Sequence, residues 1–157
     1  MKTLNYLILI GALLANTLII AQNIPISKVP GSVIAAFKAK FPHASKEKWE
    51  VENKTEFEVE FKLKGNEQSA NFDITGKWIE TETELKMSSL PEIVKSAIKS
   101  DFPGFKIVEL EKIESAINGI CYEAEIEKSE EEFEVLYSSN GKQLKKIKID
   151  EIKGHED

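Results

Sequence analysis

The sequence VPGSVIAAFKAKFP at residues 29–42 recurs as LPEIVKSAIKSDFP at residues 90–103. Both stretches start with an apolar residue before proline and end on Phe-Pro, at a spacing of 61 residues. Further along the chain, FEVEF at residues 57–61 matches YEAEI at residues 122–126. The sequence therefore predicts an internal repeat, and each copy is about as long as a very small domain.

Each copy is predicted to begin with a short helix. Apolar residues recur at every fourth position, which places them on one side of a helix over residues 30–40 and of another over residues 90–101. Pro42 disfavours helical geometry at the residue before it, so the first helix should end there. We expect both apolar stripes to pack in a core. They consist of Val33, Phe37 and Phe41 in the first copy and of Val94, Ile98 and Phe102 in the second.

The residues after each helix alternate between apolar and charged side chains, as in a strand with one buried face. Asn140-Gly141 is a typical two-residue hairpin turn. We therefore predict an α+β fold, a tandem repeat of a helix followed by a four-stranded antiparallel sheet. The expected strands cover residues 45–52, 57–63, 67–74 and 77–85, and then 105–114, 122–127, 131–138 and 142–150.

The first 21 residues have the features of an export signal. Lys2 precedes an apolar run from Leu7 to Ala21, which is shorter than the roughly 20 residues needed to span a bilayer. We expect cleavage near Gln22, a periplasmic or extracellular location and no stable membrane anchor afterwards. The predicted organisation is a signal peptide at 1–21, an N-terminal linker at 22–28, the two repeats at 29–86 and 87–150, and a disordered tail at 151–157.

The charge of the chain narrows the range of partners. Asp and Glu number 27 against 21 Lys and Arg, for a formal net charge of −6. Phosphate binding needs clustered positive charge, so nucleic acid is not an expected partner. Cys121 is the single cysteine of the sequence, which excludes an internal disulfide; we expect it to be a sheltered small hydrophobic residue.

Catalytic and metal sites are not predicted. A nucleophile needs a base within hydrogen-bonding reach, and neither His43 nor His155 has a suitable sequence context, so we expect no enzyme, no catalytic residue and no cofactor. Glutamates of the second copy, such as Glu123 and Glu125, could gather around a hard cation. The lysines of the last strand can pair with them instead, and we predict no metal. These lysines are Lys142, Lys145, Lys146 and Lys148.

The helix that closes on Phe-Pro, the strand with alternating glutamates and the segment FDITGKW at residues 72–78 resemble the PepSY-like family of bacterial envelope proteins, which is β-lactamase-inhibitor-like. The likeness covers residues 29–150. It implies a tandem helix-plus-sheet fold, a secreted location and a binding role. It supplies no catalytic residue and no inhibitory contact for this chain.

We therefore expect a secreted, non-enzymatic module that binds a protein or peptide partner through the open face of its sheets. Trp78 aligns with polar Gln143 and has the strand parity of Glu80 and Glu82, so we expect it on that face as an aromatic anchor. The alternatives are a protease-regulating module of the inhibitor or propeptide type and a small-ligand or cation-binding envelope protein. The candidate partner-binding residues are Trp78, Glu58, Glu60, Glu80 and Glu82.

Overall fold

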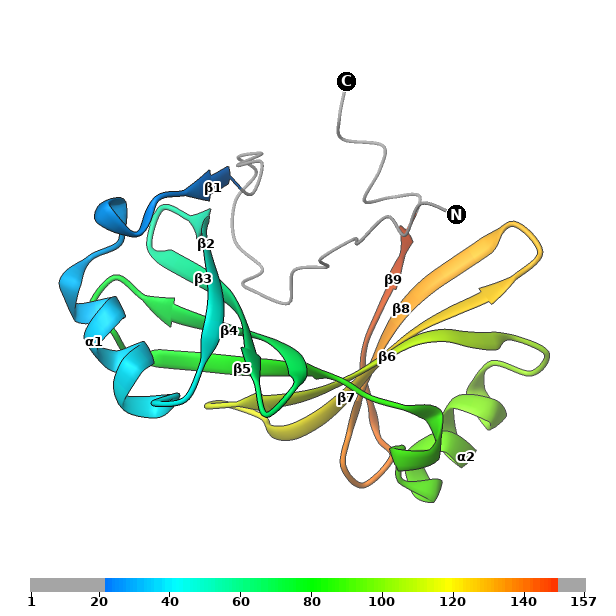
Figure 1. The fold of residues 1–157 in the computed structure, drawn as a ribbon. Helices are drawn as coiled ribbons and strands as arrows, with labels where there is room; N and C mark the ends of the chain where they lie inside the picture. Colours follow the sequence, from blue (N-terminus) through cyan, green and yellow to red (C-terminus); the bar gives the residue numbers. More distant parts are fainter. Residues whose placement is uncertain (1–21, 150–157) are drawn as a thin grey trace.

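The computed structural model describes residues 22–149, which form one nine-stranded antiparallel sheet and two α-helices (Figure 1). Each strand pairs with its neighbours along the chain, in the order β1 to β9. The strands are β1 (Gln22–Ile24), β2 (Ser45–Asn53), β3 (Glu56–Leu63), β4 (Asn66–Asp73), β5 (Trp78–Glu84), β6 (Lys106–Ser115), β7 (Gly119–Lys128), β8 (Glu131–Ser138) and β9 (Gln143–Lys148). The helices are α1 (Gly31–Lys40) and α2 (Glu92–Asp101), and short 3₁₀ turns cover Ile26–Lys28 and Met87–Ser89.

The predicted fold class is wrong, because the strands do not form two separate four-stranded sheets. β5 pairs with β6 from Glu80 opposite Ser115 to Glu84 opposite Glu111. Two separate sheets would each leave an unpaired backbone edge at this point, and the β5–β6 pairing removes both edges. The segment 22–28, expected to be a linker, contributes β1, which pairs with β2. The described chain is therefore a mostly-β protein with one continuous sheet.

The two predicted apolar stripes are confirmed as core positions. Val33 and Phe37 of α1 are fully buried against β2, β3 and β4, and the Phe37 ring lies edge-on to Phe61 and to Trp49 at 5.1 and 5.3 Å between centroids. The second core forms in the same manner. It joins Val94 and Ile98 of α2 to Leu110, Ala124, Ile126, Val135 and Tyr137.

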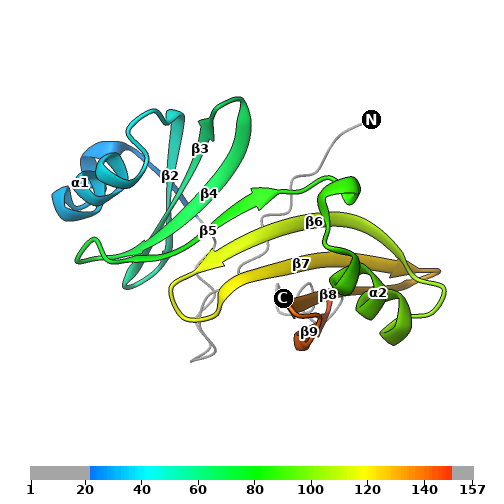
Figure 2. The same cartoon turned by 90° about the horizontal axis from the view of Figure 1, so that it is seen from below.

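Both helices cover the same face of the sheet. Val59 in β3 packs beneath α1, and Leu110 in β6 packs beneath α2. Residues that pair across neighbouring strands lie on the same face of a sheet. Val59 pairs with Ala70, Ala70 with Thr81 and Thr81 with Glu114. Glu114 lies on the same side of β6 as Leu110, so Val59 and Leu110 share one face. The helices lie far apart on the strongly twisted sheet, as Figures 1 and 2 show. We call the side without helices the open face.

The turn between β4 and β5 packs against the first turn of α1. Gly76 has φ +89°, and a Cβ atom there would lie 2.6 Å from the carbonyl oxygen of Ser32. Ser32 Oγ donates a hydrogen bond to the carbonyl of Ile74 at 2.9 Å, and Asp73 Oδ1 accepts one from the backbone N–H of Thr75 at 2.8 Å. The DITGK segment is thus a turn that holds the helix against the sheet.

Several sequence-based expectations fall outside this description. The signal peptide at 1–21 and the tail at 151–157 lie beyond the described residues, as does residue 150 at the end of the second predicted repeat. Within residues 22–149, neither helix is long and apolar enough to cross a membrane.

Candidate functional site: the open face of the sheet

Four of the five predicted site residues lie together on the open face. Glu58 of β3 and Glu80 of β5 both oppose Asn71, and Glu60 and Glu82 both oppose Ser69, so the four carboxyl groups occupy two adjacent rows across β4. Glu58, Glu80 and Glu82 are only 3, 5 and 7% exposed. The structure therefore brings the predicted glutamates together, but it buries three of them.

Trp78, the fifth predicted residue, lies on the opposite face. Phe72 pairs with Trp78 while Asn71 pairs with Glu80, so Ile79 is an extra residue that forms a β-bulge. The bulge reverses the alternation and turns the Trp78 ring towards the core beneath α1. There Lys40 Nζ stacks 3.8 Å from the ring centroid. The placement inferred from strand parity was wrong, because parity holds only along an unbroken strand.

A larger set of glutamates crosses the open face than the sequence indicated. We call it the carboxylate row, and its members lie on six strands and are buried or largely buried. Each member is close enough to the next for its charge to affect the pKa of a neighbour. The row consists of Glu52 (β2), Glu58 (β3), Glu82 (β5), Glu111 (β6), Glu123 (β7) and Glu134 (β8).

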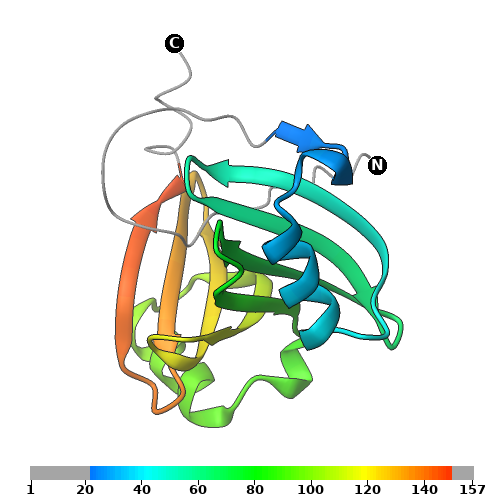
Figure 3. The same cartoon turned by 90° about the vertical axis from the view of Figure 1, so that its left-hand side faces the viewer.

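The curvature of the sheet explains why these glutamates are buried. Lys145 in β9 lowers the pKa of Glu80 in β5, although four strand spacings separate the two strands in the sheet order. At about 4.8 Å per spacing, a flat sheet would hold them roughly 19 Å apart, beyond the range of a screened interaction. The sheet therefore curves around the open face (Figure 3). The open face of the sheet is therefore sheltered from solvent at these glutamates.

Burial is the largest influence on the acidity of the row. It raises the pKa of Glu52 and of Glu111 to about 7, of Glu58 to about 8 and of Glu82 to about 9. Repulsion from neighbouring carboxylates adds to each increase, while a hydrogen bond from Ser69 opposes it at Glu82. At neutral pH, several members therefore hold a proton.

Glu123 and Glu134 form a coupled pair at the β7–β8 end of the row. Burial raises the pKa of both, and the charge of Glu134 raises that of Glu123 further. The charge of Lys145 opposes the increase at Glu134. Both oxygens of Glu134 and Oε2 of Glu123 are buried without a hydrogen-bond partner among residues 22–149. Lys145 Nζ is 3.7 Å from Glu134 Oε1. This end of the row thus contains a cation from the chain itself.

The other end of the row is not compensated in this way. Both carboxylate oxygens of Glu52 are buried, and neither has a hydrogen-bond donor among residues 22–149. The charges that affect Glu52 are those of other glutamates, namely Glu56, Glu50 and Glu80. Buried polar groups normally have partners, so such oxygens need an explanation.

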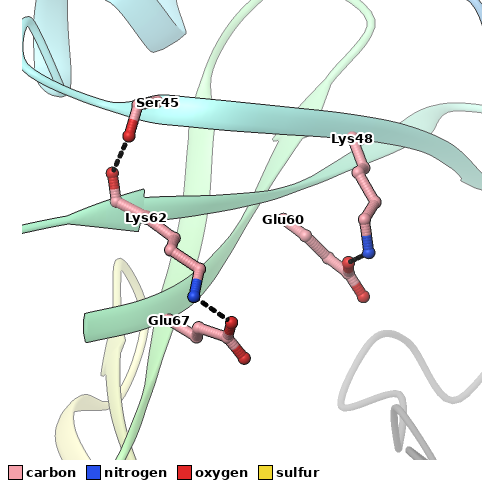
Figure 4. Close-up of polar contacts among 5 residues, drawn as sticks. All are labelled: Ser45, Lys48, Glu60, Lys62 and Glu67. Atoms are coloured by element: carbon pink, nitrogen blue, oxygen red, sulfur yellow. Dashed lines mark hydrogen bonds and ion pairs between the residues drawn. The ribbon is translucent and has the colours of Figure 1, made fainter. Parts of the chain in front are cut away.

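Lysines neutralise the margin of the open face, where the side chains are more exposed. Lys48 Nζ lies 3.0 Å from Glu60 Oε2, and Lys62 Nζ lies 2.6 Å from Glu67 Oε1 (Figure 4). Hydrogen bonding to its partner raises the pKa of Lys48, and the corresponding interaction lowers that of Glu67. Glu60, a predicted site residue, therefore belongs to this paired margin and not to the row.

The second half of the open face also has a small apolar patch. Ile113 of β6, Cys121 of β7 and Leu136 of β8 pack together; Ile113 lies opposite Glu82, and Leu136 lies opposite Glu123. Cys121 is buried here as a free thiol, in agreement with the expectation from sequence. Burial raises the pKa of this thiol, so the site does not activate it as a nucleophile.

The lysines of β9 divide between the two faces. Lys145 pairs with the row, whereas Lys146 Nζ lies 3.9 Å from the ring centroid of Phe133 on the helix side. Within residues 22–149, no group of three or more His, Cys, Asp or Glu side chains has an arrangement that could hold a metal ion.

Fold and face together define a class: a single curved antiparallel sheet with helices on one face and a buried acidic row on the other. A model of the family described as "Putative beta-lactamase-inhibitor-like, PepSY-like" matches residues 19–67 and 56–145. The chain therefore belongs to the PepSY-like family, as its motifs had indicated.

Solved structures share this fold. One is a BLIP-like protein from Bacteroides fragilis NCTC 9343, 22% identical, with a TM-score of 0.68 over 76% of this chain and 86% of that one. Another, from Bacteroides eggerthii DSM 20697, is described as "putative periplasmic proteins"; it is 18% identical, with a TM-score of 0.70 over 77% of this chain and 89% of that one. None of the curated proteins matches the sequence. At these identities the likeness establishes the fold.

Proposed function

We propose that this protein is a non-enzymatic binding module of the bacterial periplasm, whose open face binds a protein or peptide partner. The observation that carries the proposal is the pair of buried Glu52 oxygens without a donor in the described chain. Leaving a buried acceptor unsatisfied costs about 1 to 3 kcal/mol, and more when it is charged. Donors supplied by a partner would remove this cost, so binding at the face is favoured.

The comparisons support the class of function and the location. The family is described by likeness to an inhibitor of an enzyme, which is a binding activity and not a catalytic one. The description of the Bacteroides eggerthii structure supports a periplasmic location. Within the described residues, the helix side is filled by two apolar cores, which leaves the open face as the surface of the sheet available to a partner.

The test is affinity capture from a periplasmic extract with three immobilised forms of the protein. These are the parent, the open-face variant Glu52→Gln/Glu58→Gln and a control, Lys38→Ala, on the exposed side of α1. We expect the parent and the control to retain one partner in stoichiometric amount, and the open-face variant to lose it. Equal retention by all three forms would contradict the proposed face, and loss with the control alone would place binding on the helix side.

A further inference from the structure

The two ends of the carboxylate row differ in a way that indicates the chemistry of the partner. At the β8 end, the ammonium group of Lys145 lies 3.7 Å from the Glu134 carboxylate. At the β2 end, Glu52 is only 3% exposed, and the charges that affect it are all those of other glutamates. The carboxylate oxygens of Glu52 and of Glu134 alike have no hydrogen-bond donor among the described residues, so the nearby cation is what distinguishes the two ends. The contact with Lys145 shows that the row accepts an alkyl ammonium group. The described chain supplies such a group at the β8 end of the row and not at the β2 end.

The length of the row indicates the size of the partner. From β2 to β8 the row extends over seven strands of the curved sheet, six of which contribute a carboxyl group. A small cation can contact only two or three neighbouring carboxylates, because ion pairs require N···O distances of about 4 Å or less. A polypeptide with basic side chains along its length can present cations to several strands of the row at once. Arginine or lysine also has an aliphatic stem that can cover apolar surface such as the patch at Ile113 and Leu136.

On the basis of the proposed function, we propose that the carboxylate row binds lysine or arginine side chains of its polypeptide partner and releases a proton for each protonated glutamate that it engages. In each exchange the O–H bond of a glutamic acid breaks, and its proton passes to solvent. The carboxylate that remains pairs with the ammonium or guanidinium group, which keeps its own protons. The row therefore stays close to neutral in the free protein and becomes anionic only when the partner supplies the counter-charge.

The groups around Glu82 support this exchange. Its neighbours are Glu58 on β3, neutral Ser69 on β4, Glu80 on β5 and Glu111 on β6, and none of them is a cation. The pKa of Glu82, about 9, and that of Glu58, about 8, mean that both hold a proton at pH 7. An ammonium group brought alongside would lower these values and release the protons. Lys145, the cation of the open face nearest to the row, acts on Glu134 and Glu80.

Isothermal titration calorimetry with hexalysine as the probe tests the inference. Titrations of the purified protein at pH 7 in phosphate and in Tris separate the heat of binding from the heat of buffer protonation, and so count the protons released. We expect at least one proton per hexalysine, with affinity that rises about tenfold per pH unit for each proton displaced. Binding without proton release would overturn the exchange. Fully acetylated hexalysine, which has no side-chain charge, should not bind.

A matched pair of variants tests whether hexalysine affinity depends on the carboxylate row itself or only on the net charge of the protein. Glu82→Gln removes a member of the row, whereas Glu60→Gln removes a glutamate of the same face that is already paired with Lys48. We expect Glu82→Gln to bind hexalysine about tenfold more weakly and to release about one proton fewer, with Glu60→Gln close to the parent. If both variants lose the same amount of hexalysine affinity, binding depends only on net charge and the inference is overturned.

Two further outcomes distinguish this inference from the proposed function. If the parent captures a partner through the open face but does not bind hexalysine, the cationic assignment is wrong and the binding function stands. If calcium chloride binds as tightly as hexalysine and releases as many protons, the row is a site for small cations, and the polypeptide assignment is wrong.

Discussion

Replacement of Glu82 by glutamine should stabilise the protein, and the gain should grow with pH. Folding raises the pKa of Glu82 from its ordinary value of 4.5 to about 9, chiefly because the carboxyl group is buried. Between these two values the folded chain keeps a proton that the unfolded chain has lost. The stability contributed by this group is therefore complete below pH 4.5 and falls as the pH rises towards 9. Glutamine has no proton to lose, so the variant escapes this dependence.

The expected size follows from the linkage of one proton. A difference of one bound proton changes the free energy of unfolding by about 1.4 kcal/mol per pH unit. Between pH 5 and pH 8 this amounts to about 4 kcal/mol, an upper value because neighbouring glutamates share the titration. At pH 5, Glu82→Gln should lie within about 1 kcal/mol of the parent, since the hydrogen bond from Ser69 can pass to the amide oxygen. At pH 8 the variant should be the more stable by about 2 to 3 kcal/mol.

Urea denaturation at pH 5, 6, 7 and 8 measures this difference directly. Glu60→Gln is the control, because Glu60 lies on the same face but its side chain is 28% exposed and paired with Lys48. The control should lose about 0 to 1 kcal/mol at each pH, as expected for a surface ion pair. If the effect of Glu82→Gln is the same at pH 5 and at pH 8, then Glu82 does not hold a proton in the folded protein and the account of the row fails.

Three further predictions concern the fold that supports the open face. Phe37→Ala should cost about 3 to 5 kcal/mol and Ile98→Ala about 2 to 5 kcal/mol in chemical denaturation, since both side chains are buried in the two cores; losses below about 1 kcal/mol would mean that the helices do not pack on the sheet. Gly76→Ala should be less stable than Gly65→Ala by about 1 to 3 kcal/mol, because both glycines have φ +89° but only a Cβ at Gly76 meets backbone; equal losses would exclude that close contact. Trp78→Ala should lower stability by about 2 kcal/mol and leave partner binding unchanged, measured on one sample, because its ring packs on the helix side; the reverse pattern would return Trp78 to the binding site.

Much of the local structure followed from the sequence because its causes are local. The four-residue spacing of Val33 and Phe37 indicated α1 within a residue of its observed ends. The alternation around Glu58 indicated β3, and it also indicated that the glutamates would share one face. The same alternation at Glu123 and Glu134 was the signal for the rest of the carboxylate row. It was missed as a site because alternation reveals which residues share a face and does not reveal how that face is curved.

The sequence by itself determined the periodicity of each element, the positions of the turns and which side chains share a face along an unbroken strand. These properties depend on residues within a few positions of one another. The tertiary structure alone decided that β5 pairs with β6, that a bulge turns Trp78 towards the core, and that Glu52, Glu58 and Glu82 are buried together. The physical reason is that the β5–β6 pairing and the curvature of the sheet depend on contacts between residues far apart in the chain, such as Glu80 and Ser115. The pKa of a carboxyl group depends in turn on the water and charge that those contacts leave around it.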